Sequence, residues 1–189
     1  MPPKVKITKE DIVNTAVMLI REKGEEAVNA RAIAAHLNCS TQPVFSNFAT
    51  MEELLEEALI NAYNRYLGFI KNEVESGKYP VYKSFGMAYI RFAKEEKELF
   101  KFLFMRDRTG GEMAPSPDFE EAVQLIMQAN GVTEETARLI QLEMWTCVHG
   151  IGTMLATSYL PLEWELIENI LTDIYQGIRA KHTAKEEKQ

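Results

Sequence analysis

Apolar residues recur along this chain at spacings of three and four, and no segment sustains a strict alternation of apolar and polar positions. Spacings of three and four place side chains on one face of a helix, whereas alternation would indicate strands. The clearest stripe is near the C-terminus, where the intervals are 3, 4, 3 and 4: Trp164, Ile167, Leu171, Ile174 and Ile178. The pattern predicts an all-α fold of about nine helices.

Capping residues predict where these helices begin and end. Thr8 with Asp11 resembles a capping box, and Gly24 is expected to end the first helix. Asn29, Ser40 and Thr50 are expected to begin the next three helices, and the helix that begins at Ser40 is expected to end near Asn47. Later helices are expected over about 81–94, 95–105, 118–130, 133–159 and from Pro161 onward. Residues 106–117 are expected to form a mobile loop, and the charged tail after about residue 181 is expected to be disordered.

Residues 30–49 carry the pattern of a helix-turn-helix. Ala34 is small enough for a close helix approach, and Asn38 tolerates the left-handed backbone that a tight turn needs. Four apolar residues would hold the second helix against the first: Ile33, Leu37, Val44 and Phe48. In such a motif the second helix enters the major groove of DNA. An ordinary helical hairpin is the alternative interpretation.

Residues 8–59 resemble the N-terminal region of the tetracycline-repressor (TetR/AcrR) family. The resemblance rests on Arg-Ala-Ile-Ala-Ala at 31–35, Ser-Thr-Gln-Pro-Val-Phe-Ser-Asn-Phe at 40–48 and Glu-Glu-Leu-Leu at 52–55. It implies a DNA-binding domain over 1–50 and a ligand-binding and dimerisation domain over 51–189. The chain departs from the family at three positions. Asn38 replaces a turn glycine, and Phe45 and Met51 replace a tyrosine and a lysine that contact phosphates. Losing two phosphate contacts should weaken DNA binding and flatten its salt dependence.

Gln42 is the best candidate for reading a base, because its amide can pair with adenine in the major groove. Pro43 adds an apolar surface that suits a thymine methyl group. The predicted DNA-contacting set is Asn29, Arg31, Ser40, Thr41, Gln42, Pro43, Phe45, Ser46 and Asn47. Lys4, Lys6 and Lys9 are expected either to form a basic arm on the phosphate backbone or to be a solvated tail.

The rest of the chain is rich in tyrosine, phenylalanine and methionine. Most of these residues are expected to form a core, and the alternative is that they line a cavity for an apolar ligand. The predicted effector-binding set is Tyr63, Tyr66, Met87, Phe104, Met105, Met127, Trp145 and His149, in a wider group that includes Tyr89 and Met113. Trp145, His149 and Gly150 resemble a short motif of one branch of TetR-family sensor domains. A structural hydrogen bond to the backbone is the alternative role for His149.

The last two helices are too apolar for every outward face to meet water. The predicted dimer interface is Ile151, Leu155, Trp164, Ile167, Leu171 and Ile174, which would form a four-helix bundle between two chains. Such a dimer would hold two recognition helices about 34–36 Å apart, one turn of DNA. The alternative is that both helices only cover the monomer core.

Charge and composition refine this picture. The net charge is −7, but residues 1–50 carry +1 and the remainder −8, which suits a nucleic-acid-binding head on an acidic body. No apolar run has the length of a membrane span and the N-terminus lacks a signal-peptide core, so a cytoplasmic protein without a membrane partner is expected. Two cysteines and three scattered histidines predict neither disulfide nor metal site. No Gly-rich phosphate loop or nucleophile motif is present, so neither an enzyme nor a cofactor is expected.

Together these features predict a ligand-responsive transcriptional repressor. It would bind a palindromic operator in double-stranded DNA as a homodimer, and a small apolar or aromatic effector would release it. The alternative is a helical ligand-binding protein of the same fold whose DNA binding is weak or lost.

Overall fold

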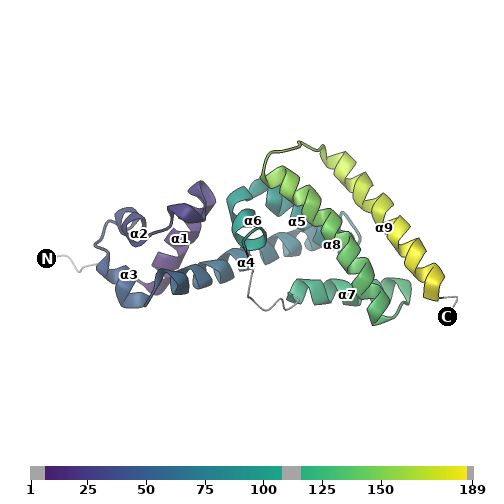
Figure 1. Cartoon of the computed structure of the whole chain (residues 1–189), viewed down its shortest axis with the longest axis horizontal. Coiled ribbons are helices and arrows are strands. Elements are labelled where there is room, and N and C mark those ends of the chain that lie inside the picture. The colour runs from purple at the N-terminus through teal and green to yellow at the C-terminus, as the bar shows by residue number, and fades with distance from the viewer. Residues whose placement is uncertain (1–6, 108–115, 187–189) are drawn as a thin grey trace. The chain divides into compact units, whose positions relative to one another are not determined.

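The computed structural model describes residues 7–107 and 116–186, and these ranges contain α-helices, one 3₁₀ helix and no strands (Figure 1). The helices are α1 (Lys9–Lys23), α2 (Ala30–His36), α3 (Gln42–Asn47), α4 (Met51–Glu75), α5 (Val81–Glu95), α6 (Lys97–Phe104), α7 (Pro117–Asn130), α8 (Glu134–Ala156) and α9 (Trp164–Glu186). The 3₁₀ helix, Glu25–Ala27, was not expected from the sequence. The predicted all-α class is confirmed. Lys4, Lys6, Met113 and most of the predicted loop lie outside the described residues.

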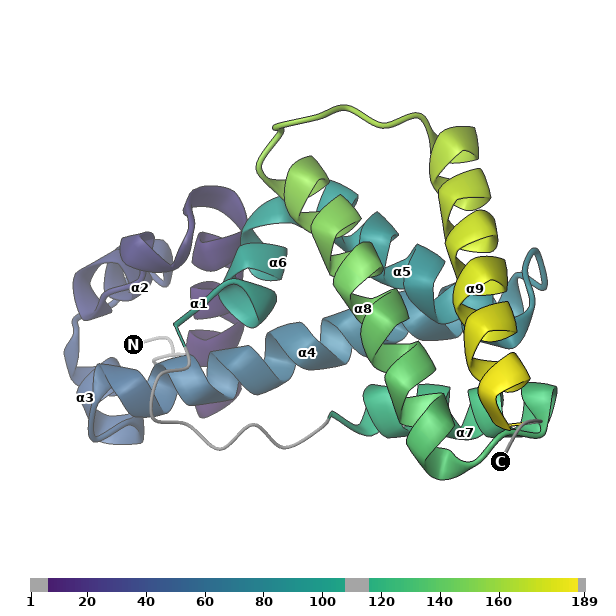
Figure 2. The same ribbon diagram turned by 45° about the vertical axis from the view of Figure 1, so that its right-hand side comes forward.

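The chain divides into two compact units. The head unit comprises Met1–Leu67 and Glu96–Asp107, and the body unit comprises Gly68–Glu95 and Arg108–Gln189. Helix α4 contributes residues to both units. The head unit thus holds more of the chain than the predicted DNA-binding segment 1–50, because α6 packs against α1 (Figure 2).

Local sequence explains most helix boundaries. Thr8 and Asp11 form the predicted capping box, in which the Asp11 carboxylate accepts from the Thr8 N–H at 2.9 Å and the Thr8 hydroxyl accepts from the Asp11 N–H at 3.1 Å. Asn29 and Thr133 accept backbone hydrogen bonds at the starts of α2 and α8. Gly24, with φ of 86°, ends α1 as expected, and Gly131, with φ of 65°, ends α7.

The predicted boundaries of α3, α8 and α9 are wrong. Helix α3 begins at Gln42 with Thr41 as its N-cap, not at Ser40, and no side chain caps it. Helix α8 ends at Ala156 because Ser158 takes a φ of 55° and the Tyr159 N–H bonds back to the Met154 carbonyl at 2.9 Å. The last helix begins at Trp164, not at Pro161, and continues to Glu186 through the tail that was expected to be disordered.

A buried histidine explains why the predicted tail is helical. His182 lies in the penultimate turn of α9 and is 6% exposed. Its Nε2 lies 2.9 Å from a carboxylate oxygen of Glu143 on α8, and Lys181 reaches the same oxygen at 3.4 Å. These contacts hold the end of α9 against α8.

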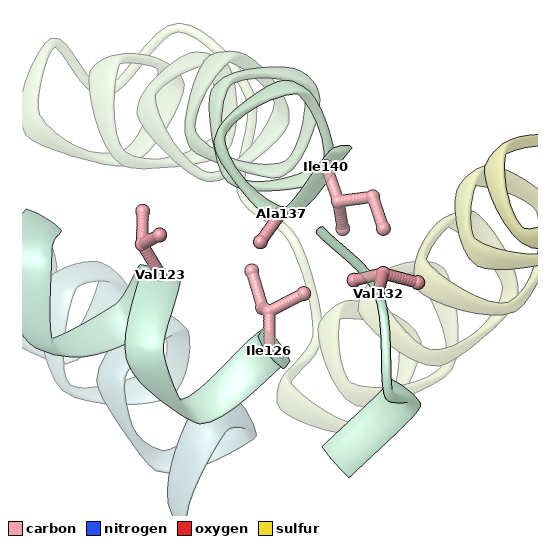
Figure 3. Packing of buried hydrophobic residues seen from close by; sticks show 5 residues of the cluster. All are labelled: Val123, Ile126, Val132, Ala137 and Ile140. Atoms are coloured by element: carbon pink, nitrogen blue, oxygen red, sulfur yellow. The ribbon is translucent and has the colours of Figure 1, made fainter. Parts of the chain in front are cut away.

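The body unit is built around α8, which packs against α5, α7 and α9 (Figure 2). Figure 3 shows one fully apolar part of its core, formed by Val123, Ile126, Val132, Ala137 and Ile140. Tyr82, Met127 and Tyr175 border this cluster. Within the described ranges, no helix combines the length and apolar character that crossing a bilayer requires.

The head unit contains a buried carboxylate that joins three helices. Glu96, at the start of α6, is 3% exposed. It accepts hydrogen bonds from Arg21 of α1 and, at 3.0 and 2.6 Å, from Nε and Nη2 of Arg65 of α4. A carboxylate this buried needs such partners, since an unpaired one would be strongly destabilising.

Candidate DNA-binding surface and sensor site

The recognition-helix candidate α3 has one buried face and one outward face. Val44 and Phe48 are 1% and 2% exposed and fix the helix to the rest of the head unit. Gln42, Phe45 and Ser46 are exposed and follow the i, i+3, i+4 spacing of a single helix face. The residues that were expected to contact DNA from α3 are therefore on the surface.

The turn before α3 has the expected geometry. Asn38 takes a φ of 51°, and the Cys39 N–H donates to the Ala34 carbonyl at 2.9 Å. Ala34 is buried, as a close approach between the two helices requires. Asparagine thus fills the left-handed position for which glycine is the usual residue.

The other predicted DNA-contacting residues also lie near the surface. Asn29, Arg31 and Ser40 are exposed, and Thr41, Pro43 and Asn47 are half-buried. Several polar groups are engaged within the helices. The Asn29 side chain accepts from the Ala32 N–H at 2.9 Å, and the Asn47 amide donates to the Pro43 carbonyl at 2.8 Å. These groups contribute to the local fold whether or not DNA is bound.

Lys9 does not form a flexible arm, because it lies in the first turn of α1. Its ammonium donates to Glu57 of α4 at 2.8 Å and lies 5.1 Å from the centre of the Phe48 ring. Arg21 is paired with Glu96. Two of the basic residues of segment 1–50 therefore serve the packing of the head unit.

The predicted effector-binding residues fall into different units. Tyr63, Tyr66, Phe104 and Met105 belong to the head unit. There Tyr66 is 2% exposed, and its ring packs edge-on against Phe104 with centroids 5.3 Å apart. Tyr63 lies 5.8 Å from Tyr66, whereas Met105 is exposed. This arrangement is the packing of an aromatic core.

Met87, Met127, Trp145 and His149 belong to the body unit. Met87 is fully buried, and Met127 borders the apolar cluster of Figure 3. The rings of Trp145 and His149 stack, with centroids 5.0 Å apart and planes inclined by 15°. The sequence placed these two residues on one face of a helix, and they do lie together.

A side chain from another helix holds the ring of His149. Its Nδ1 shares a 2.8 Å hydrogen bond with the hydroxyl of Tyr89, a buried residue of α5. Burial lowers the pKa of His149, which favours the neutral imidazole. Trp145 remains 39% exposed, so the array runs from the interior of the body unit to its surface.

Thr153 lies one helical turn beyond His149 and was not singled out in the sequence. Its hydroxyl is buried and has no hydrogen-bond partner among the described residues. Buried hydroxyls are seldom left in this state, since each such group loses its bonds to water. No sequence signal marks Thr153, because a threonine inside a helix ordinarily bonds to the carbonyl four residues earlier.

The residues predicted at a dimer interface are mostly inside the monomer. Ile151, Leu155, Ile167 and Leu171 are at most 7% exposed. Trp164 and Ile174 are half-buried, and Arg91 of α5 lies over the Trp164 ring at 4.6 Å. Four of the six side chains therefore have little surface left for a partner. The exposed large apolar residues of α8 and α9 are Leu139, Leu142, Trp145 and Leu166.

The described part of the chain was expected to hold no metal site, and its two cysteines were expected to be thiols. No three histidine, cysteine, aspartate or glutamate side chains are grouped there as ligands. Cys39 and Cys147 are both half-buried thiols. Burial raises the pKa of Cys147, which disfavours the reactive thiolate.

Comparison with known proteins gives a consistent assignment for both parts of the chain. Residues 12–58 match the family model of the bacterial regulatory proteins of the tetR family, and residues 82–173 match that of a tetracyclin repressor-like C-terminal domain. No curated protein sequence matches the chain.

Solved structures share the fold at low sequence identity. A TetR-family protein from Vibrio parahaemolyticus has 13% identity and a TM-score of 0.56, covering 89% of this chain and 97% of its own. A transcriptional regulator of the same family from Aquifex aeolicus has 14% identity and a TM-score of 0.51, covering 93% and 98%. These structures show a shared fold, and the two family models, which match the N-terminal and C-terminal parts, show that the chain belongs to the TetR family of transcriptional regulators.

Proposed function

We propose that this regulator is a repressor that binds a palindromic operator as a homodimer and is released by a small aromatic effector. The observation that carries the proposal is the outward face of α3, where Gln42 is exposed within a region matched by the family's DNA-binding model. An exposed glutamine on a recognition helix can pair with adenine through both groups of its amide.

The effector site that we propose lies on the helix face of Trp145, His149 and Thr153 in the body unit. Three features of this face support it: a half-exposed indole, an imidazole held by Tyr89, and a Thr153 hydroxyl without a hydrogen-bond partner in the described ranges. Ligand pockets commonly combine such aromatic surfaces with a few polar groups. A planar aromatic compound with one hydrogen-bonding group would suit this chemistry.

The dimer surface that we propose uses the exposed residues of α8 and α9, not the buried stripe. Leu142, at 50% exposed, lies one turn after Leu139 and one turn before Trp145. Leu139 and Leu142, and separately Leu166 of α9, are exposed apolar side chains that a second copy could cover. A two-fold dimer would present two recognition helices to two operator half-sites.

Release would follow from thermodynamic linkage between the two ligands of the protein, the effector and the operator DNA. If the effector binds better to the conformation that DNA does not accept, each ligand must lower the affinity of the other by the same factor. Helix α4 contributes to both units, so it is the element through which we expect this coupling to pass.

One group of observations favours the alternative, a ligand-binding protein with little DNA affinity. Lys9 and Arg21 are engaged inside the head unit, Phe45 lacks a hydroxyl and Met51 lacks a charge. Phosphate contacts supply much of the affinity for DNA, so a head with few available cations would bind weakly.

A mobility-shift titration at two salt concentrations separates the two functions. The duplex is the promoter region of the protein's own gene, with a scrambled duplex of equal length as the control. The repressor model expects preferential binding to the promoter, and Gln42→Ala should change base preference more than overall affinity. Gln124→Ala, on an exposed part of α7, is the matched control variant. Equal binding to both duplexes would support the alternative.

Fluorescence tests the effector site and ultracentrifugation tests the dimer. In Trp164→Phe, Trp145 is the single tryptophan of the chain, so a bound aromatic compound should quench its emission. Thr153→Val should weaken the binding of a hydrogen-bonding compound more than the binding of an analogue that lacks the hydrogen-bonding group.

Leu142→Glu should shift the sedimentation of the protein from dimer to monomer. Unchanged operator affinity at saturating effector would remove the release model.

A further inference from the structure

Phe45 is the most exposed large apolar side chain of α3, with 59% of its surface accessible. It lies three residues after Gln42 on the outward face of this helix, and the buried residues Val44 and Phe48 fix that orientation. The Phe45 ring is therefore not part of the packing that holds α3 in place. A partner that covered this ring would gain free energy from the apolar surface removed from water.

The polar neighbours of Phe45 are turned toward their own helix. The Ser46 hydroxyl donates to the Gln42 carbonyl at 2.8 Å, and the Asn47 amide donates to the Pro43 carbonyl at 2.8 Å. This leaves the Gln42 amide and the Phe45 ring as the prominent groups on the outward face, beside the half-buried ring of Pro43. The face thus pairs one hydrogen-bonding group with an apolar surface.

Duplex DNA offers a specific counterpart to an apolar ring in the major groove. A phenylalanine cannot donate a hydrogen bond to a phosphate or to a base edge. Among the base edges in the major groove, the thymine C5-methyl is the apolar group, and it distinguishes a T·A pair from the other three arrangements. A glutamine beside it would read adenine, so both groups point to A·T-containing sequence.

We propose that Phe45 is a specificity-determining residue that recognises thymine through its 5-methyl group, one contact in each operator half-site. This inference rests on the proposed function, because it requires that α3 enters the major groove. It assigns to Phe45 a base contact in place of the phosphate contact that a tyrosine hydroxyl could make.

The test is a double-mutant cycle between the protein and the methyl group. Duplexes bound by the wild-type protein are first selected from a random pool. Each thymine of the selected operator is then replaced by deoxyuridine, which lacks the methyl group and keeps the same hydrogen-bonding edges. Binding is measured by fluorescence anisotropy for the wild type, Phe45→Ala and, as the control variant, Gln42→Ala.

One symmetric thymine position should be sensitive to the methyl group. We expect its replacement to weaken wild-type binding about fourfold in one half-site and about fifteenfold in both, from the transfer free energy of one methyl group per site. Phe45→Ala should bind the thymine operator and the deoxyuridine operator equally, whereas Gln42→Ala should still prefer the thymine operator. Because the Phe45 ring is exposed, its removal should leave the circular dichroism spectrum and the melting temperature unchanged.

Each outcome has a distinct meaning. Selected DNA that binds equally well with uridine at every position would overturn the role of Phe45 and leave the proposed function intact. The same holds if Phe45→Ala keeps the full preference for thymine. A selection that enriches no sequence would overturn the proposed function itself, and the inference with it.

Discussion

Single residues with unusual backbone conformations decide where this chain turns. Within the described ranges, Asn38 and Ser158 are the non-glycine residues with positive φ, at 51° and 55°. Asn38 sets the turn of the helix-turn-helix, and Ser158 ends α8. Asparagine pays a smaller steric cost in this region than most residues, so Asn38 replaces a glycine without distorting the turn.

Substitutions at Asn38 should therefore rank by their tolerance of the left-handed region. Asn38→Gly should change the free energy of unfolding by less than about 0.5 kcal/mol, whereas Asn38→Val should lower it by about 1–2 kcal/mol. Urea denaturation measures both. Ala35→Val is the matched control, because it introduces the same side chain at an exposed helical position nearby. If both valine variants lost the same free energy of unfolding, the left-handed backbone of Asn38 would not be the cause of the loss.

The pKa of His149 gives the body unit a defined pH dependence. Burial lowers this pKa from its ordinary value of 6.5, so the unfolded chain binds the proton more readily than the folded chain. Acid therefore favours unfolding, and the contribution of His149 to stability is lost as the pH falls below about 6.5. In His149→Gln, the free energy of unfolding should fall less between pH 7.5 and 5.5 than in the wild type.

Tyr89→Phe separates burial from hydrogen bonding in the same titration. It removes the hydroxyl that bonds to His149 and keeps the apolar surroundings. Because burial is the cause of the lowered pKa, this variant should retain the wild-type pH dependence at a lower overall stability. A flat profile in Tyr89→Phe would show that the hydrogen bond, and not burial, controls the proton.

At the scale of helices, the sequence predicted elements well where a local group defines an end. Thr8, Asn29, Gly24 and Gly131 act within one turn of their own position, so their roles follow from the sequence nearby. The start of α9 and its extension to Glu186 depend instead on contacts with distant helices, such as that of His182 with Glu143. Spacing alone carries no information about those contacts.

The same distinction applies to the candidate sites. The common face of Trp145 and His149 followed from their spacing, but the Tyr89 hydroxyl that holds the imidazole comes from another helix. The isoleucine and leucine stripe of α9 was correctly identified as apolar. Two of its residues, Ile167 and Leu171, are buried against the same chain. Their burial depends on how α9 packs against α5 and α8, which periodicity does not specify.

Gly86 marks a close approach among α5, α8 and α9. A Cβ at this position would lie 3.4 Å from Val148 and 3.5 Å from Leu171, which is ordinary contact. Gly86→Ala should therefore raise the free energy of unfolding by up to about 1 kcal/mol through helix propensity. Gly86→Leu should lower it by about 1–3 kcal/mol through overpacking. Thermal and urea unfolding measure both changes.

Gly177 of α9 provides the control for Gly86. A Cβ there meets nothing within 4 Å. Both Gly177→Ala and Gly177→Leu should stabilise the helix by similar amounts, because alanine and leucine have similar helix propensities. If leucine were tolerated equally at both glycines, the three-helix contact would be looser than the distances at Gly86 indicate.

For the whole molecule, charge is the property that most constrains DNA binding. The chain carries −7, and Lys9 and Arg21 of the head unit are already paired with Glu57 and Glu96. A regulator with this distribution has few cations to exchange for the counterions of DNA, so its affinity should depend weakly on salt. Specificity would then rest more on contacts to bases than is usual for a basic DNA-binding domain.

Restoring one cation at the start of α4 tests this argument. Met51→Lys places a lysine where the family has a phosphate contact, and one such contact in each protomer should steepen the slope of log K against log salt by about 1.8 for a dimer. Ile60→Lys is the matched control, because it adds the same charge at an exposed site on the same helix. Its slope should stay near the wild-type value, since counterion release requires contact with a phosphate. Equal slopes for both variants would mean that net charge controls the affinity, and that residue 51 does not contact a phosphate.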